Sequence, residues 1–190
     1  MKKKVLRRFL QLFVICLILV LSYEAYLEFY YYRDKTDWLF PLLPESGFVI
    51  RRDRWGRGDF GAKRNGGRRH QGVDLLAKEG SGVVAVRSGR ARVGEGPHGM
   101  GKFVSVTHRD GIRTIYGHLS AIYVKDRSRV RQGQVIGTVG KTGNASEEGV
   151  LPHLHFEMRQ GAKVLNPTPI LSVRVQSPRD TTGLFNQYGK

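Results

Sequence analysis

The chain has 190 residues, of which 40% are hydrophobic and 25% charged, a composition typical of one globular domain with an accessory segment. Its single cysteine, Cys16, excludes an intramolecular disulfide and any multi-cysteine zinc or iron–sulfur site. The 32 Lys and Arg residues outnumber the 16 Asp and Glu residues, so the formal charge of +16 predicts an anionic partner: nucleic acid, a lipid surface or an acidic polymer.

The N-terminus joins a basic segment to an apolar one. Residues 1–8 contain five cations and no acid, and the fifteen residues 9–23 are almost entirely apolar or aromatic. A spanning helix needs roughly 20 residues, and the tyrosine-rich residues 24–32 suit the membrane–water interface and extend the helix there. The sequence therefore predicts a cytoplasmic basic segment at 1–8 and a single transmembrane signal-anchor at 9–32, with the remainder outside the cytoplasm.

Two other interpretations of this segment are open. A cleaved signal peptide needs small residues at the first and third positions before the cut, but bulky Tyr23 lies two residues before Ala25. Ile15, which precedes Cys16, is too large for a usual lipoprotein processing site. A buried core helix fits poorly because a basic start rarely adjoins an apolar run in a soluble domain. These patterns favour an uncleaved anchor.

The next residues show little hydrophobic periodicity. A juxtamembrane connector is predicted at 33–57, with prolines at positions 41 and 44. Residues 51–69 are rich in arginine and glycine and are predicted to be loop-like. Two interpretations of their charge are equally open: a solvated surface, or a cationic lip beside a substrate-binding groove.

Short strand-like segments separated by turns follow from residue 83 onward. The predicted strands are residues 83–87, 90–94, 102–107, 112–116, 134–140 and 153–159. We expect the first two to form a hairpin across Ser88-Gly89, and the third and fourth to flank a turn at 108–111. No helical pattern of three or more turns follows residue 32. The predicted fold class is all-β, an antiparallel sheet sandwich or barrel.

Two short motifs contain residues that bind metals. His70 and Asp74 are separated by three residues, and His153 and His155 alternate in a predicted strand, so both imidazoles lie on one face. Three N and O ligands with one open position are typical of a catalytic zinc site. His70, Asp74 and one histidine of the pair can supply them, and the other histidine can act as a general base. Each motif alone is also compatible with a surface feature or a turn hydrogen bond.

Four blocks of sequence strongly resemble the lysostaphin/LytM-type zinc endopeptidases of bacterial cell walls. They are RRHQGVDLLAKEGSGVVAV, HRDGIRTIYGHLS, VRQGQVIGTVGKTGN and PHLHFEMRQGAKVLNP, in unbroken order within residues 58–170. The resemblance implies a LytM-type metallopeptidase domain at 58–170, with a compact all-β, barrel-like fold. It also implies one Zn2+ per chain, bound in a groove floored by an antiparallel sheet.

The resemblance assigns roles to five residues. His70, Asp74 and His155 match the three zinc ligands of the family. His153 matches the catalytic base, and His118 matches the second active-site histidine, which helps to polarise water or to hold the developing oxyanion. No H-E-x-x-H helix is present, so the more familiar zinc-protease arrangement is excluded.

The sequence departs from the family pattern before the first ligand, and three other residues need an interpretation. Some members place a tyrosine shortly before the first ligand, whereas residues 57–69 here contain Phe60 but no tyrosine, so that role is vacant or filled by an arginine. Tyr116 either lines the groove or is a half-buried sheet residue. His98 and His108 lie among turn formers and are expected to have turn or surface roles.

The predicted function is zinc-dependent hydrolysis of peptide bonds in peptidoglycan, at a bacterial cytoplasmic membrane and outside the cytoplasm. The expected partners are peptidoglycan, the membrane through the N-terminal helix, and complexes of cell-wall enzymes. The alternative is a non-catalytic relative that activates another wall hydrolase. Nucleic-acid binding is not expected, because the chain has no recognition helix or ribonucleoprotein motif. The tail at 171–190 carries no assignment.

Overall fold

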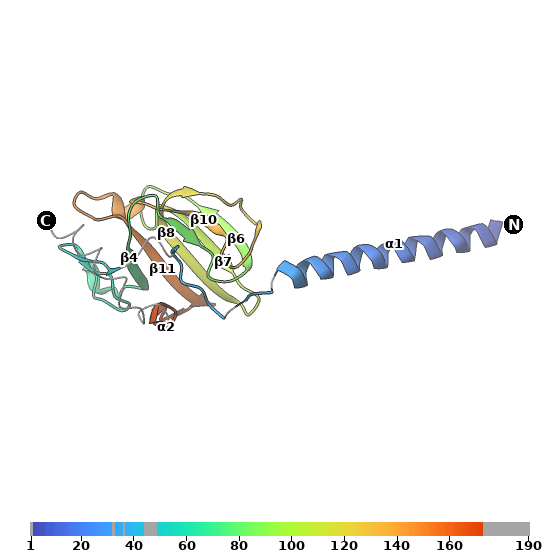
Figure 1. Cartoon of the computed structure of the whole chain (residues 1–190), viewed down its shortest axis with the longest axis horizontal. Helices are drawn as coiled ribbons and strands as arrows, with labels where there is room; N and C mark the ends of the chain where they lie inside the picture. The colour runs from blue at the N-terminus through green and yellow to red at the C-terminus, as the bar shows by residue number, and fades with distance from the viewer. Residues whose placement is uncertain (1, 32, 36, 44–48, 173–190) are drawn as a thin grey trace. The chain divides into compact units, whose positions relative to one another are not determined.

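The computed structural model describes residues 2–31, 33–35, 37–43 and 49–172 (Figure 1). The chain divides into two compact units, Met1–Arg33 and Asp34–Lys190. Helix α2 (Thr168–Ser172) is the last described element, so nearly all of the tail expected at 171–190 lies outside the described residues.

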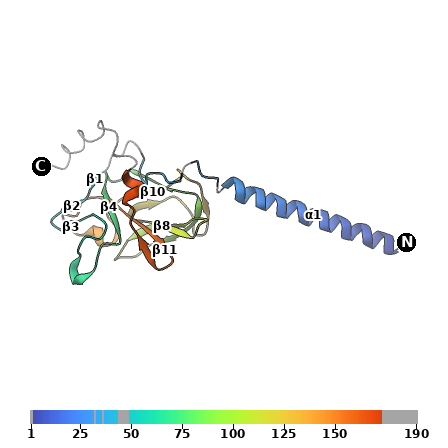
Figure 2. The ribbon, with the colours of Figure 1, turned by 90° about the horizontal axis from the view of Figure 1, so that it is seen from below.

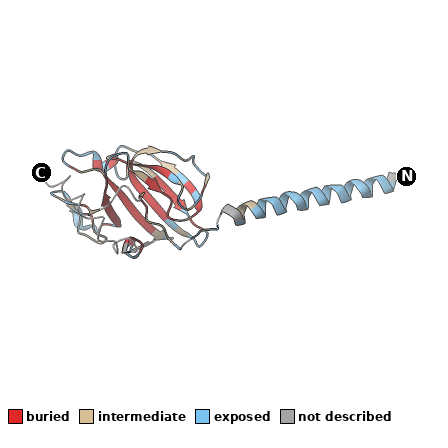
Figure 3. Cartoon of the chain, in the orientation of Figure 1, coloured by how far each residue is buried: buried red, intermediate tan, exposed pale blue. Residues whose placement is uncertain are grey.

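The first unit is a single long helix, α1 (Lys2–Tyr31). Among the described residues, it is the one helix long and apolar enough to cross a membrane, over Lys3–Phe29. The apolar side chains between Val5 and Tyr26 are exposed, as the pale blue part of the helix in Figure 3 shows. The helix continues from the apolar run through residues 24–31, so the predicted extension of the helix is confirmed for these residues.

The second unit is built almost entirely of strands. They are β1 (Val49–Ile50), β2 (Arg52–Asp53), β3 (Gly56–Arg57), β4 (Gly72–Leu76), β5 (Gly82–Val84), β6 (Gly89–Gly94), β7 (Lys102–Thr107), β8 (Ile112–Ile122), β9 (Arg129–Val130), β10 (Val135–Val139), β11 (His153–Gln160) and β12 (Lys163–Leu165). Two 3-10 turns, η2 (Asn65–Gly67) and η3 (Gly143–Ser146), lie in the loops. The predicted all-β class is confirmed.

The main sheet is antiparallel and open. Its strands follow the order β1-β4-β11-β8-β7-β6-β9, and β10 pairs with both β8 and β5. The strands curve around one another without closing into a barrel (Figure 1, Figure 2). β8 is long enough to pair with β7 and β11 along its first part and with β10 at its end. The predicted antiparallel sheet is therefore confirmed, in an open rather than a closed form.

One predicted hairpin is confirmed and one is wrong. β7 and β8 pair across the 108–111 turn, as expected. β5 instead pairs with β10, while β6 pairs with β7 and β9. The backbone between β5 and β6 is hydrogen-bonded elsewhere: Ala85 N–H donates to Gln134, and Ser88 N–H donates to the Asp34 carboxylate. Because these backbone groups bond to other segments and not across β5 and β6, Ser88-Gly89 does not form a tight hairpin turn.

The residues after Arg33 form part of the second unit. Leu42 pairs with Val83 in an isolated bridge and is only 2% exposed, and Val84 N–H donates to the Pro41 carbonyl. The early part of the segment expected to be a connector therefore adds to the core of the sheet.

The core lies on one face of the central strands. Val73 and Leu75 of β4, with Leu154 and Phe156 of β11, are completely buried in one cluster (Figure 3). Each such side chain contributes about 1.5–3 kcal/mol to stability by leaving water. Because side chains alternate along a strand, burying these residues directs their neighbours to the opposite face.

Candidate metal centre

The candidate site lies on the other face of β4 and β11. His155 is paired directly with Asp74 in the antiparallel register of these strands. Alternation places His153, His155 and Glu157 on this face, while Leu154 and Phe156 enter the core, as the sequence predicts. His70 lies just before β4 and is buried beside them.

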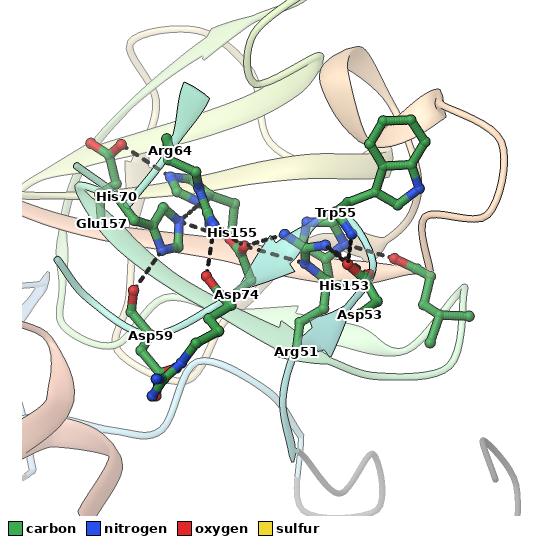
Figure 4. A network of polar contacts seen from close by, with 12 residues as sticks. Arg51, Asp53, Trp55, Asp59, Arg64, His70, Asp74, His153, His155 and Glu157 are labelled. Atoms are coloured by element: carbon green, nitrogen blue, oxygen red, sulfur yellow. Dashed lines mark hydrogen bonds and ion pairs between the residues drawn. The ribbon is translucent and has the colours of Figure 1, made fainter. Parts of the chain in front are cut away.

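Three side-chain atoms meet at one point (Figure 4). His155 Nδ1 lies 2.8 Å from Asp74 Oδ1, and His70 Nε2 lies 3.0 Å from the same oxygen. The two histidine nitrogens are 3.1 Å apart. All three residues are buried, and together they form a group able to hold a metal ion.

The opposite nitrogens of both histidines are held by acceptors. His70 Nδ1 lies 3.0 Å from the Asp59 carbonyl oxygen, to which it can only donate. His155 Nε2 lies 3.0 Å from Glu157 Oε1, and Arg159 binds the other Glu157 oxygen. Such bonds select the tautomer in which the nitrogen facing the site carries a lone pair, as they do around metal-bound histidines.

The second oxygen of Asp74 is bound by two arginines. Arg51 donates to Oδ2 from Nη2 at 3.0 Å and from Nε at 3.3 Å, and Arg64 donates from Nη2 at 2.9 Å. Arg51 Nη1 also binds the Asp53 carboxylate at 2.7 Å. These donors occupy Oδ2 and leave Oδ1 to face the two histidines.

The donor set fits a divalent cation. When the nitrogens of His70 and His155 that face Asp74 carry no proton, three lone pairs converge, two from nitrogen and one from the carboxylate; without a metal, protons on these nitrogens bridge to Asp74 Oδ1 instead. Ligands at tetrahedral Zn2+ lie about 3.3 Å from one another, close to the 2.8, 3.0 and 3.1 Å separations of the three atoms. Two nitrogens and one oxygen also match the ligand types of catalytic zinc sites.

The electrostatics of the cluster favour a positive charge at its centre. Burial by itself lowers the pKa of His155, but the hydrogen bonds with Asp74 and Glu157 outweigh burial and raise it to about 9. Burial opposes ionisation of Asp74, yet hydrogen bonds from His155 and His70 hold its pKa well below the usual range. The carboxylate is therefore ionised across the physiological pH range.

His118 reaches the site through an unusual backbone conformation. In the register with β11, Tyr116 is opposite Phe156 and Gly117 is opposite His155, so regular alternation would direct residue 118 into the core. His118 instead has φ of 61°, a left-handed conformation that is uncommon outside glycine. This local break turns its imidazole to the face that carries His155.

Because of this break, the side chains of Tyr116 and His118 lie on opposite faces of the sheet. Its side chain is completely buried on the core face, with its hydroxyl bonded to Val86 N–H and Thr114. The interpretation in which Tyr116 lines the groove is therefore wrong, because strict parity with His118 does not hold. The alternative of a sheet tyrosine is the one observed, and its burial is complete.

His118 and His153 face each other beside the three candidate ligands, His70, Asp74 and His155. Their rings are 4.9 Å apart between centroids, and the His118 ring is 5.7 Å from that of His155. His118 Nδ1 donates to the Thr142 carbonyl at 2.8 Å, and His153 Nδ1 donates to Leu151 at 2.7 Å. In both residues the lone pair is therefore on Nε2.

Burial lowers the pKa of both of these histidines. The pKa of His118 falls to about 3, because burial is reinforced by the neighbouring charges of His153 and His155. The pKa of His153 falls to about 4, where burial outweighs the attraction of the Asp74 carboxylate. Both imidazoles are therefore neutral acceptors at neutral pH.

The structure also places the other residues that the sequence singled out. His98 is exposed in a loop, as expected. His108 begins the β7–β8 turn, but its ring is buried, so a surface role is wrong for its side chain. Phe60 packs against the core. The arginine-rich residues include the short β2–β3 hairpin, so they are not all loop.

Four residues that bind the candidate ligands or hold them in place were not identified from the sequence. Glu157 follows His155 by two positions, so strand alternation was a sufficient signal for it. Arg51, Asp59 and Arg64 come from the arginine-rich residues, where no periodic pattern exists. Their contacts with Asp74 and His70 depend on how that segment folds over β4.

Comparison with known proteins identifies relatives of the second unit. The model described as "Peptidase family M23" matches residues 68–167, more than half of the chain. The cell division protein DipM of Caulobacter vibrioides is 40% identical over 126 residues, 60% of this chain and 20% of DipM. The murein hydrolase activator NlpD of Salmonella dublin is 32% identical over 69% of this chain and 31% of NlpD.

A third relative and two solved structures are also similar to the second unit. The DD-carboxypeptidase/endopeptidase Mpg of Neisseria gonorrhoeae is 37% identical over 60% of this chain and 25% of Mpg. The catalytic domain of lysostaphin from Staphylococcus simulans aligns with a TM-score of 0.52 and 34% identity, over 62% of this chain and 90% of that domain. The catalytic domain of EnpA from Enterococcus faecalis aligns with a TM-score of 0.53 and 31% identity, over 64% and 89%. The chain spans less than a third of the length of the three relatives it matches.

Proposed function

The chain belongs to peptidase family M23, and we propose that it is a zinc-dependent endopeptidase that hydrolyses peptide bonds in peptidoglycan. One observation carries the proposal: His70 Nε2, Asp74 Oδ1 and His155 Nδ1 converge within 3.1 Å of one another, with every other polar atom of these side chains already bound. Relatives that are named peptidases add support.

The three ligands have distinct supports. His70 and His155 present lone pairs because Asp59 and Glu157 fix their tautomers. Asp74 presents a single oxygen because two arginines hold the other. A Zn2+ ion bound by this set supplies Lewis acidity toward a peptide carbonyl and lowers the pKa of a water ligand to about 7.

His153 and His118 have the geometry for proton transfer. His153, oriented by the Leu151 carbonyl, accepts a proton from the attacking water at Nε2 and returns it to the leaving amine. His118, oriented by the Thr142 carbonyl, accepts a hydrogen bond at Nε2 and orients the same water. The left-handed backbone of His118 is a local cost that serves this placement.

Metal analysis and wall digestion test the proposal together. The full chain, purified in detergent, is expected to contain about one zinc per molecule and to release new peptide ends from purified peptidoglycan. A chelator should abolish the release and added zinc should restore it. A chain that neither binds zinc nor cuts any wall peptide would overturn the proposal.

A second function is supported by the names of two relatives. DipM is named a cell division protein and NlpD a murein hydrolase activator. In this alternative the domain binds and activates another wall hydrolase without cutting the wall itself. An Asp74→Ala variant that fully restores the phenotype of a deletion strain would favour activation, whereas loss of restoration favours catalysis.

The proposed place of action rests on α1. The helix begins with a basic cluster and continues into an apolar run long enough to span a bilayer. Cations at the end of a span favour the cytoplasmic side, so residues 1–8 would lie inside and the peptidase domain outside. We propose an uncleaved anchor at 9–32 in a bacterial cytoplasmic membrane. A mature protein that begins at Met1 supports it, and cleavage after the helix contradicts it.

A further inference from the structure

The residues that flank the β2–β3 hairpin are hydrogen-bonded to the backbone of Asp74, a candidate metal ligand. Arg51 N–H donates to the Asp74 carbonyl at 2.9 Å, and Asp74 N–H donates to the Gly58 carbonyl at 2.9 Å. Gly58 N–H closes the root by donating to Arg51 at 2.6 Å. A Cβ on Gly58 would lie 2.8 Å from Asp74 Cβ, so this close approach requires glycine. The hairpin is thereby fixed relative to Asp74.

The tip of the hairpin is held near the other side of the site. Arg54 Nη2 donates to the Glu148 carbonyl at 3.2 Å, in the loop that precedes His153. Asp53 points inward, where its carboxylate binds Arg51 and accepts from Trp55 N–H at 2.9 Å. The hairpin therefore reaches from Asp74 to the segment before His153. Figure 4 shows Trp55 at the end of the polar network that contains Arg51, Asp53 and His153.

The outward side chains of this hairpin are three arginines and a tryptophan. Arg52 and Arg57 share one carboxylate, that of Asp59, at 3.5 and 2.9 Å, and their side chains are 65% and 67% exposed. Trp55 is 48% exposed, with the Arg54 guanidinium 5.4 Å from its ring centroid. We call the exposed side chains of Arg52, Arg54, Trp55 and Arg57 the hairpin surface. It carries a net positive charge and an aromatic ring beside the candidate metal centre.

We propose that the hairpin surface binds the anionic glycan–peptide polymer of the wall outside the bond that is cut. The arginines match free carboxylates of stem peptides, and an exposed indole can stack on the apolar face of a sugar ring. The inference rests on the proposed function, because the polymer must lie beside the ligands for its peptides to be cut. It also favours the cationic lip over a merely solvated surface for these residues.

A second pair of arginines in the same domain provides a matched control. Arg92 and Arg127 share the carboxylate of Asp126 at 3.2 and 3.6 Å, and their side chains are 60% and 73% exposed. An Arg92→Gln/Arg127→Gln variant therefore removes the same charge from similarly exposed positions that also share one carboxylate. The main difference from an Arg52→Gln/Arg57→Gln variant is the location of the lost charge.

Co-sedimentation with insoluble peptidoglycan tests the proposal. The full chain in nanodiscs of neutral lipid is mixed with purified wall sacculi under chelation, so that sedimentation reports binding without cleavage. Removing Arg52 and Arg57 is expected to weaken binding about fivefold, as two exposed charge contacts would. The control pair should change it by less than about 1.5-fold. Trp55→Ala should weaken binding about fivefold and Trp55→Phe less, because a smaller ring remains.

Each contrary outcome has a defined meaning. If the two arginine double variants lose binding to sacculi equally, net charge alone is responsible. If the hairpin variants lose no binding, the hairpin surface does not contact the wall. Either result overturns the proposal. A parallel test uses vesicles of phosphatidylglycerol, and loss of vesicle capture alone would assign the surface to lipid and overturn it too. Unchanged zinc content in the hairpin variants shows that the centre is intact.

The inference and the proposed function fail separately. A parent chain that binds sacculi but never cuts peptides refutes the endopeptidase and leaves the surface standing. A parent chain that cuts the wall, with binding unaffected by the hairpin variants, refutes the surface alone.

Discussion

Two buried polar clusters, each built around histidine, lie in the same domain and differ in one respect. In the cluster of His70, Asp74 and His155, three lone pairs converge on a common point. In the second, around His108, the hydrogen bonds run in sequence from one residue to the next. Burial alone therefore does not distinguish a site from a structural network.

In the second cluster, the polar groups are hydrogen-bonded to one another and to the nearby backbone. His108 Nδ1 donates to the Ser88 carbonyl at 3.0 Å, and its Nε2 lies 2.9 Å from the Thr114 hydroxyl. That hydroxyl, whose proton can point to Nε2, is 3.1 Å from the Tyr116 hydroxyl, which accepts from Val86 N–H at 3.0 Å and has its own proton for Thr114. Each group meets a complementary donor or acceptor, so no cation is required. The difference supports the proposed metal-binding role of the first cluster and indicates a stabilising role for the second.

The largest expected effect comes from removing a converging atom. His155→Ala should abolish stoichiometric zinc binding and reduce wall hydrolysis by more than about a hundredfold, beyond the range of changes behind the ligands. Metal content and peptide release measure the two losses. If the variant retained zinc and activity, the assignment of the first cluster as the metal centre would be wrong.

A smaller effect on zinc binding is expected from changing Glu157, which holds the far nitrogen of His155. Glu157→Gln keeps the size of the side chain but removes the charge that supports His155, so zinc affinity should fall about 10- to 100-fold. Competition with a chelating dye reports the affinity. Glu79→Gln, at an exposed position, removes the same charge and should leave the affinity unchanged. An equal fall in both variants would contradict a specific role for Glu157.

The second cluster should respond in stability rather than in metal binding. His108→Ala leaves the Ser88 carbonyl and the Thr114 hydroxyl without this partner, so the free energy of unfolding should fall by about 1–3 kcal/mol. Denaturant titration measures the change, and zinc content should be that of the parent. Loss of zinc at native conditions would show that the two clusters are not independent.

The smallest expected effect is the contribution of His108 to the pH dependence of the free energy of unfolding. Burial lowers the pKa of His108, and the nearby Arg87 charge opposes the attraction of Asp110 and Asp34. The unfolded chain then binds a proton at higher pH than the folded chain, so stability is present above about pH 6.5 and declines as the pH falls below it. The slope cannot exceed about 1.4 kcal/mol per pH unit for one proton.

Comparing the parent with His108→Gln isolates this contribution. Both proteins are unfolded by denaturant between pH 5 and 8 in the presence of a chelator, which removes metal loss from the comparison. The parent should lose free energy of unfolding as the pH falls, whereas the variant lacks the group that titrates. The difference in free energy of unfolding between parent and variant should therefore become smaller toward acid pH. A difference independent of pH would show that His108 does not titrate on unfolding in this range.

Strand alternation made part of the site predictable from sequence. In β11, His153 and His155 share a face because side chains alternate, and the apolar Leu154 and Phe156 fix which face enters the core. The β7–β8 hairpin followed from a local turn. The resemblance to a known family supplied the residues to be brought together, namely His70, Asp74 and His155.

Other features depended on contacts between distant residues. The failed β5–β6 hairpin was decided by partners such as Asp34 and Gln134, which lie far away in the chain. The side chain of His118 reaches the site only through a left-handed residue within β8, which no periodic pattern reveals.

Sequence by itself determined which side chains could bind a metal and which strand faces they occupy, because periodicity and side-chain chemistry are local properties. Tertiary structure alone decided which arginines hold Asp74 and how the hairpin surface is placed beside it. Those contacts join segments without a repeating pattern, and their geometry depends on the packing of the whole sheet.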